Sequence, residues 1–160
     1  KETKSVLIIF NTISDSKELY KKLSHAYTSD ELYLLNTHFT PNDRKLKIER
    51  LKERLNKSKQ TILVSTQLIE AGVDISFPVV YRAITGVDSI GQGAGRCNRE
   101  GELSGLGKVY LYIPENGYPK KGLIKPMAQI TEKYLNDHIF IKANISHKFA
   151  QKLSKYDTGI

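Results

Sequence analysis

The sequence lacks several features that would assign it to a special class of protein. It contains one cysteine, Cys97, and no tryptophan among its 160 residues. A single cysteine excludes an internal disulfide and a multi-cysteine metal site, which favours a reducing, cytoplasmic compartment. No apolar run approaches the roughly 20 residues that a membrane-spanning helix needs. The first residues carry no apolar segment behind a basic start, so we expect no secretory signal.

Motifs that bind phosphate or metal are also missing. The chain has no Gly-x-x-x-x-Gly-Lys-Ser/Thr loop and no Gly-x-Gly-x-x-Gly after a predicted strand, so it has no phosphate cradle of its own. The glycine-rich stretch 91–95 follows no strand and lies within a predicted helix. The four histidines are scattered, without a His-Asp pair or a His-x-x-His spacing. We therefore predict no metal site.

The composition is that of an ordinary globular domain. Hydrophobic residues make up 39% and charged residues 26% of the chain, values that exclude disorder. The net charge is +8, and the basic excess lies at the two ends of the chain, whereas residues 61–118 are slightly acidic. Two interpretations stay open on charge alone: lysines that solvate outer helix faces, or a polyanionic partner such as nucleic acid.

Short apolar runs alternate with amphipathic stretches along the chain. We expect strands at Val6–Phe10, Leu32–Leu35, 61–65, 79–84 and 109–113. We expect helices at 14–27, capped by Asp15 or Ser16, at 41–55, capped by Thr40, shortly after Asp88, and across 125–154. This alternation predicts a three-layer α/β domain with a mainly parallel sheet over residues 1–115, and a short helical extension over 116–160. Ligands of such sheets bind at the carboxyl ends of the strands.

Two segments carry chemistry beyond packing. The first, residues 65–75, places Ser65 and Thr66 at the end of the third strand, where hydroxyls and backbone N–H groups can bind a phosphate. Gly72 permits a sharp turn there, after which Asp74 can accept hydrogen bonds from a sugar hydroxyl.

The second segment, residues 88–99, contains two arginines. If this segment is helical, Arg96 and Arg99 lie at i and i+3 on one face, with Gln92 one turn earlier. Two guanidinium groups that project together suit a transferring phosphoryl group. A surface cluster of ion pairs is the alternative explanation. Between the arginines, we expect Cys97 to be a packing residue and not a nucleophile.

These segments resemble known helicase motifs. Residues 66–74 resemble motif V of superfamily 2 helicases, and residues 92–99 resemble their motif VI, Gln-Arg-x-Gly-Arg-x-x-Arg. Residues 65–82 and 94–101 are more similar still to the helicase part of the CRISPR-associated helicase-nuclease of type I systems, and 37–44 resembles a further segment of that family. The resemblance covers about residues 5–115 in the right order and spacing.

The resemblance implies the second RecA-like lobe of a DNA-dependent ATPase. In that family ATP and Mg²⁺ lie between two lobes, and the first lobe supplies the phosphate loop and the Mg²⁺-binding acidic motif. Here Arg96 and Arg99 would be arginine fingers with Gln92 beside them, and Gly72 and Asp74 would lie near the ribose.

Single-stranded DNA would cross both lobes of such an ATPase. The residues of this chain that the resemblance and the strand ends place on its backbone are Asn11, Thr12, His38, Arg44, Ser65 and Thr66. The other partners implied are the first lobe and the nuclease domain of the same parent protein, and a CRISPR surveillance complex; no membrane is implied. The family suggests 3′-to-5′ movement, although the sequence itself does not fix the polarity.

One departure from the motif leaves alternatives open. Where the motif VI pattern has Gln-Arg, this sequence has Gln92-Gly93, and Gly91 occupies a position expected to be apolar. Hydrolysis could survive in weakened form, or the lobe could be a non-catalytic module that binds DNA or protein. Another superfamily 2 motor, of DNA repair or restriction, is a further alternative.

Overall fold

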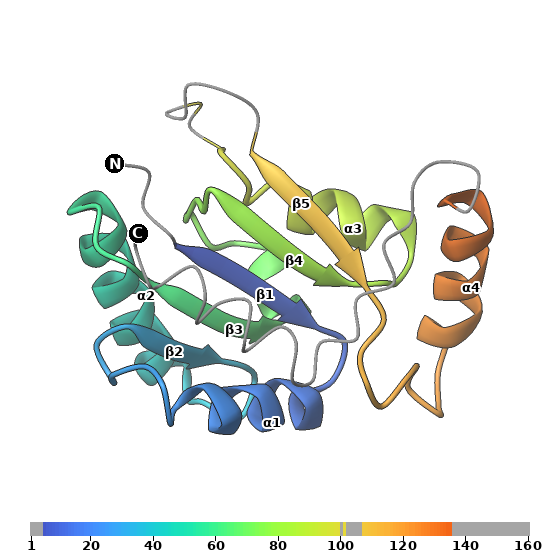
Figure 1. Cartoon of the computed structure of the whole chain (residues 1–160), viewed down its shortest axis with the longest axis horizontal. Helices are drawn as coiled ribbons and strands as arrows, with labels where there is room; N and C mark the ends of the chain where they lie inside the picture. Colours follow the sequence, from blue (N-terminus) through green and yellow to red (C-terminus); the bar gives the residue numbers. More distant parts are fainter. Residues whose placement is uncertain (1–4, 100, 102–106, 136–160) are drawn as a thin grey trace.

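Five strands form one sheet in which every neighbouring pair is parallel (Figure 1). The computed structural model describes residues 5–99, 101 and 107–135. The strands are β1 (Val6–Phe10), β2 (Leu32–Leu35), β3 (Ile62–Thr66), β4 (Val79–Ala83) and β5 (Lys108–Tyr112), in the spatial order β2-β3-β1-β4-β5. Because all five run the same way, their carboxyl ends share one edge of the sheet. The predicted parallel sheet is confirmed.

Helices cover both faces of this sheet. α1 (Ile13–Leu23) packs on one face, and α2 (Pro41–Asn56), the 3₁₀ turn η1 (Gln67–Glu70) and α3 (Val87–Ala94) pack on the other. α4 (Ile124–Leu135) stands beyond the carboxyl ends of β4 and β5 (Figure 1). This is the three-layer α/β arrangement that the sequence predicts.

The core follows from the alternation of side chains along buried strands. In β1, Ile8 and Phe10 belong to the core cluster on the α1 side, together with Leu19, whereas Leu7 and Ile9 belong to the cluster on the opposite side. Both β1 faces are buried, because helices cover both sides of a parallel sheet. A strand buried on both faces reads as a continuous apolar run, and this run made β1 predictable to the residue.

The two ends of α1 differ from the sequence prediction, whereas the other predicted boundaries agree to within about a residue. α1 begins at Ile13, and its N-cap is Thr12, not Asp15 or Ser16. The hydroxyl of Thr12 accepts a hydrogen bond from the Asp15 N–H at 3.1 Å, so Asp15 acts inside the first turn. The predicted helix also continued to residue 27, whereas α1 ends at Leu23. In contrast, α2 has the predicted cap, because Thr40 accepts from the Asp43 N–H.

α4 is attached to the loop that follows β4. The Thr131 hydroxyl donates to the Thr85 carbonyl oxygen at 2.7 Å, and the Met127 side chain lies against Gly86. The predicted helix at 125–154 is confirmed as far as Leu135, and its remainder lies outside the described residues. The boundary at residue 115 between lobe and extension stays a prediction.

Candidate functional site

Polar residues gather at the carboxyl ends of three neighbouring strands. Asn11 and Thr12 follow β1, Asn36 follows β2, and Thr66 ends β3. The register pairs the last residues of β1 and of β2 with those of β3, so these positions stand side by side. Four of the six residues predicted to bind nucleic acid therefore lie at the ends of β1 and β3: Asn11, Thr12, Ser65 and Thr66.

The segment after β3 has the predicted build. It continues into η1, and Gly72 then reverses the chain with φ at 71°, a left-handed conformation that glycine adopts without strain. Ser65 is buried, and its hydroxyl donates to the Leu35 carbonyl oxygen at 2.7 Å. Thr66 is the N-cap of η1 but makes no side-chain capping hydrogen bond. Both residues are buried, with Thr66 5% exposed, but of the two hydroxyls only that of Ser65 is engaged by the hydrogen bond to β2.

The prediction that Arg96 and Arg99 share one helix face is wrong. α3 ends at Ala94, and both arginines lie in turns on either side of the short bridge at Cys97. Residues 96–98 instead pair with Phe77: the Phe77 N–H donates to the Arg96 carbonyl oxygen and the Asn98 N–H to the Phe77 carbonyl oxygen, each at 2.9 Å. This bridge brings the arginines onto the segment that follows β3.

Arg96 is fastened to the end of η1. Its Nε donates to the Ile69 carbonyl oxygen at 3.1 Å and its Nη2 to the Glu70 carbonyl oxygen at 2.9 Å. The residue is only 9% exposed. Burial lowers the pKa of Arg96, and the nearby positive charge of Arg99 lowers it further. A guanidinium nevertheless stays charged near neutral pH, so Arg96 presents a fixed positive charge.

Arg99 is held more loosely. Its Nη1 lies 2.8 Å from Asp74 Oδ1, and the two side chains are 42% and 68% exposed. An ion pair this exposed contributes little free energy. Breaking this ion pair therefore costs little free energy, so Arg99 is available to bind a phosphate and Asp74 to accept a hydrogen bond from a sugar hydroxyl.

The three positions singled out before the arginines, Gly91, Gln92 and Gly93, lie on α3. Gln92 is exposed, and a Cβ on Gly91 would meet open space. Gly93 is buried, and a Cβ there would lie 3.3 Å from Ile9 Cδ1 and 3.4 Å from Arg82 Cδ. The space next to Gly93, where the motif arginine is missing, is thus filled by the Arg82 side chain.

Sequence reasoning missed a buried polar network under α3. Arg82 of β4 is 1% exposed, and its Nε donates to Glu70 Oε1 at 2.6 Å. Its Nη1 donates to Asn11 Oδ1 at 2.7 Å and its Nη2 to Ser89 Oγ at 3.0 Å. Burial lowers the pKa of Arg82, and the Glu70 carboxylate opposes this. A signal existed: one acid and one base each interrupt an apolar stretch, and buried charges occur in pairs.

The predicted nucleic-acid residues differ in how free their side chains are. The Asn11 amide is engaged inside the domain, since it donates to the Ile84 carbonyl oxygen and accepts from Arg82. The Thr12 hydroxyl donates to Asp15 Oδ2. His38 is exposed, with Nδ1 3.0 Å from Lys17 Nζ.

Arg44 lines a groove between α2 and the segment after β3. Its Nε is buried and has no hydrogen-bond partner among the described residues. The groove has a volume of about 440 Å³, with an apolar floor and a largely basic rim. Its lining residues are Leu35, Pro41, Arg44, Lys45, Ile48, Glu49, Lys52, Leu68, Ala71 and Val73.

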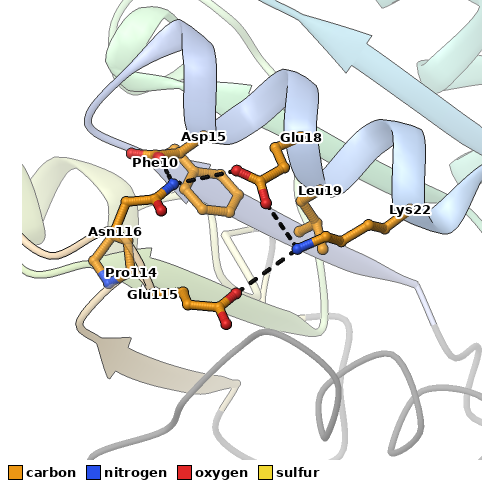
Figure 2. A pocket seen from close by; sticks show the side chains of 8 residues that line it. All are labelled: Phe10, Asp15, Glu18, Leu19, Lys22, Pro114, Glu115 and Asn116. Atoms are coloured by element: carbon orange, nitrogen blue, oxygen red, sulfur yellow. Dashed lines mark hydrogen bonds and ion pairs between the residues drawn. The ribbon is translucent and has the colours of Figure 1, made fainter.

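A small cavity lies on the other face, beside α1 (Figure 2). Asn116 donates to Asp15 and to Glu18, and Lys22 lies between Glu18 and Glu115. Its volume of about 30 Å³ suits a water molecule and is far too small for a nucleotide. The contacts around it fasten the segment after β5 to α1.

The described part of the chain contains neither a metal-binding cluster nor a membrane-spanning helix. Among residues 5–99, 101 and 107–135, no group of three His, Cys, Asp or Glu residues could hold a metal ion. No helix within that part of the chain is long and apolar enough to cross a membrane.

Comparison with protein families gives a match that includes the whole candidate site, from Asn11 to Arg99. A family model described as "CRISPR-associated nuclease/helicase Cas3, C-terminal" matches residues 2–102. A Cas3 nuclease/helicase of Haloferax volcanii is 48% identical over 68 residues, which cover 42% of this chain and 7% of that protein. A putative Cas3 of Methanocaldococcus jannaschii is 31% identical over 152 residues, which cover 90% of this chain and 20% of that protein. The chain thus spans a minor part of each relative.

Solved structures share the fold at lower identity. The crystal structure of T. fusca Cas3 with ADP matches with a TM-score of 0.69 and 19% identity, over 96% of this chain and 20% of that one. A chain in a structure titled "CRISPR RNA-guided surveillance complex, pre-nicking" matches with a TM-score of 0.68 and 20% identity, over 98% of this chain and 22% of that one. The C-terminal domain of the DEAD-box protein Dbp5 matches with a TM-score of 0.57 and 16% identity, over 94% of this chain and 82% of that one. The RecA-like fold is therefore shared with helicase C-terminal domains.

Proposed function

Because this chain belongs to the family of the C-terminal domain of the CRISPR-associated nuclease/helicase Cas3, we propose that it forms the second motor lobe of an ATP-dependent single-stranded DNA translocase. The observation that carries the proposal is the meeting of two segments. Arg96 and Arg99, which follow α3, bond to residues 69–74, which follow β3. Two guanidinium groups and an exposed carboxylate then stand together beside the strand ends.

In this proposal the nucleotide is ATP, and its hydrolysis to ADP and phosphate drives the motor. Arg96 is the fixed finger toward the phosphates, since two of its nitrogens already hold η1 in place. Arg99 would bind a phosphate of the nucleotide, and Asp74, near Gly72, would accept a hydrogen bond from a ribose hydroxyl in place of their mutual ion pair. Gln92 lies exposed one turn before the arginines and completes the polar rim. The first lobe would supply the phosphate loop and the Mg²⁺ ligands, as the resemblance to superfamily 2 helicases implies.

Single-stranded DNA follows the carboxyl edge of the sheet in this proposal. Thr66, Thr12, His38 and Arg44 contact its phosphates, and such backbone contacts are independent of base sequence, as translocation requires. Asn11 and Ser65 are turned inward and contribute by holding the strand ends in position. Closing and opening of the two lobes around ATP would then move the strand.

The partners follow from the same family. We propose that residues 1–115 pack against the first lobe of the parent protein, which also carries the nuclease, and that residues 116–160 extend this lobe. A CRISPR surveillance complex would recruit the parent protein. The cytoplasmic location stays a prediction.

The test is the DNA-stimulated ATPase activity of the full-length parent protein. Arg96→Ala should lower kcat by about 10³-fold, the loss typical of an arginine finger. Arg50→Ala removes an exposed arginine on α2 and serves as the matched control, with unchanged kcat. Single-stranded DNA binding of both variants should remain at the level of the unsubstituted protein. Arg96→Ala should melt at a somewhat lower temperature, because two buried carbonyl oxygens lose their donor, and a circular dichroism spectrum at the assay temperature shows that it is folded.

The outcomes separate the motor from its alternative. Full ATPase activity in a folded Arg96→Ala variant would remove Arg96 from the site. A parent protein that binds DNA but does not hydrolyse ATP would favour the non-catalytic binding module.

A further inference from the structure

The buried network under α3 links the two segments on which the proposed function rests. Its members come from four places: Asn11 after β1, Glu70 in η1, Arg82 in β4 and Ser89 in α3. Besides the Arg82 bonds given above, Arg82 Nη1 donates to the Ala83 carbonyl oxygen at 2.8 Å, and Ser89 Oγ donates to Glu70 Oε2 at 2.5 Å. Both carboxylate oxygens of Glu70 are thus engaged.

Glu70 connects this network to Arg96. Its side chain bonds to Arg82 and Ser89, while its backbone carbonyl oxygen accepts from Arg96 Nη2. A shift of Glu70 would therefore move an acceptor that orients the Arg96 guanidinium. Arg82 fixes the side chain of Glu70, and by that route it fixes the place of Arg96.

Gly93 and Arg82 are complementary in space. The Cβ direction of Gly93 points at Ile9 Cδ1 and at the Cδ and Cγ atoms of Arg82. A long side chain at position 93 would need the volume that Arg82 already fills. The motif VI pattern that residues 92–99 resemble has an arginine at position 93. In this chain Arg82 of β4 places its side chain next to position 93 instead.

We propose that Arg82 is a positioning residue that compensates for Gly93 and, through Glu70, holds the segment after β3 and Arg96 in the geometry needed for ATP hydrolysis. The inference rests on the proposed function. A buried ion pair adds little stability over a well-packed apolar pair, so stability alone does not require these charges at this place. Their bonds join η1, β4 and α3, the elements whose relative positions decide where Arg96 stands.

The test compares variants of the full-length parent protein in its DNA-stimulated ATPase reaction. The double variant Arg82→Met with Glu70→Leu removes both buried charges and keeps an apolar filling, so folding should persist. We expect kcat to fall on the order of tenfold, because misplacement of a catalytic group is costly. We expect KM for ATP, DNA binding and the melting temperature to stay nearly unchanged. A purely structural pair would leave kcat of the folded double variant at the starting value, and that result would overturn the proposal.

Three further variants test the compensation, and this test does not depend on the double variant. Arg82→Ala should lower kcat, and Gly93→Arg in the Arg82→Ala background should restore part of it by returning a guanidinium from α3. Gly93→Arg alone should lower kcat, since it collides with Arg82. Higher activity of Gly93→Arg alone, or no rescue in the combined variant, would contradict the proposal.

A milder variant covers the case in which the larger changes prevent folding. Ser89→Ala removes one bridge to Glu70 and should lower kcat several-fold at constant KM, whereas Ser24→Ala, on the exposed end of α1, should not. No effect of Ser89→Ala on kcat would speak against the network. If Arg96→Ala abolishes hydrolysis while all network variants remain active, only this inference fails; if Arg96→Ala is itself silent, the proposed function fails.

Discussion

Cys97 is the single thiol of the chain, and its surroundings make it a poor nucleophile. Its Sγ lies 3.4 Å from the Lys108 carbonyl oxygen and 3.5 Å from that of Pro78, and burial raises the pKa of the thiol. Since the thiolate is the reactive form, we predict that iodoacetamide alkylates Cys97 at pH 8 several-fold more slowly than it alkylates free cysteine. Mass spectrometry over time measures this rate.

Unfolding in urea provides the control for that prediction. The unfolded chain loses the burial that raises the pKa, so Cys97 should then react at the rate of an ordinary thiol. Because the folded pKa is raised, the folded rate should reach this level only at higher pH. Equal rates for folded and unfolded protein at pH 8 would show that Cys97 is a solvent-accessible, ordinary thiol.

Single residues were predictable where chemistry and local spacing agree. Asp74, Arg96 and Arg99 are marked by residue type within short segments, and the structure brings them together, although not through the predicted helix face. Their roles stay predictions. The ion pair between Arg82 and Glu70 was not predicted, although only 12 positions separate the two residues in the sequence. A charge in an apolar strand has no local spacing that reveals its partner. The partner of such a charge depends on which helix packs on the strand, and this is decided by tertiary structure.

The cap of α2 allows a prediction about that element. α2 buries only Leu51 completely, so its stability depends strongly on local interactions. The Thr40 hydroxyl accepts from the Asp43 N–H at 3.1 Å. Thr40→Ala should therefore lower the free energy of unfolding by about 1 kcal/mol, measured by urea denaturation of the chain. Thr37→Ala, an exposed change just before the helix, should stay within about 0.5 kcal/mol.

An unchanged stability of Thr40→Ala would also be informative. If Thr40→Ala unfolds at the same urea concentration as the unsubstituted chain, α2 is held by its packing on the sheet and not by its cap. A lower midpoint for Thr37→Ala as well would point to the loop in general.

Elements were predictable to within a few residues, and their ends were the weak point. The start of α2 carries two concordant signals, Thr40 and the proline that follows it, and both were found. The start of α1 was misplaced, because Thr12, Asp15 and Ser16 are all residue types that cap helices. The end of α3 has no side-chain periodicity to mark it, since Gly91, Gly93 and Gly95 alternate there. The helical face predicted for Arg96 and Arg99 failed for that reason.

The whole molecule is one half of a proposed two-lobed site, and this division has a consequence for the 160-residue chain on its own. The described residues include no metal cluster, and the sequence has no phosphate loop. An arginine finger, the role proposed for Arg96, stabilises charge on a phosphoryl group that other residues must bind and align. We therefore predict no Mg²⁺-dependent ATP hydrolysis by this chain, measured as phosphate release with and without single-stranded DNA.

The control for this prediction is the complete site. The full-length parent protein in the same buffer should hydrolyse ATP, and Arg96→Ala should abolish that activity. Turnover by the isolated chain that is itself lost in Arg96→Ala would mean that one lobe suffices for catalysis. Such a result would place the phosphate-binding groups within these 160 residues, and the groove of about 440 Å³ beside Arg44 and Lys45 would be the first place to look for them.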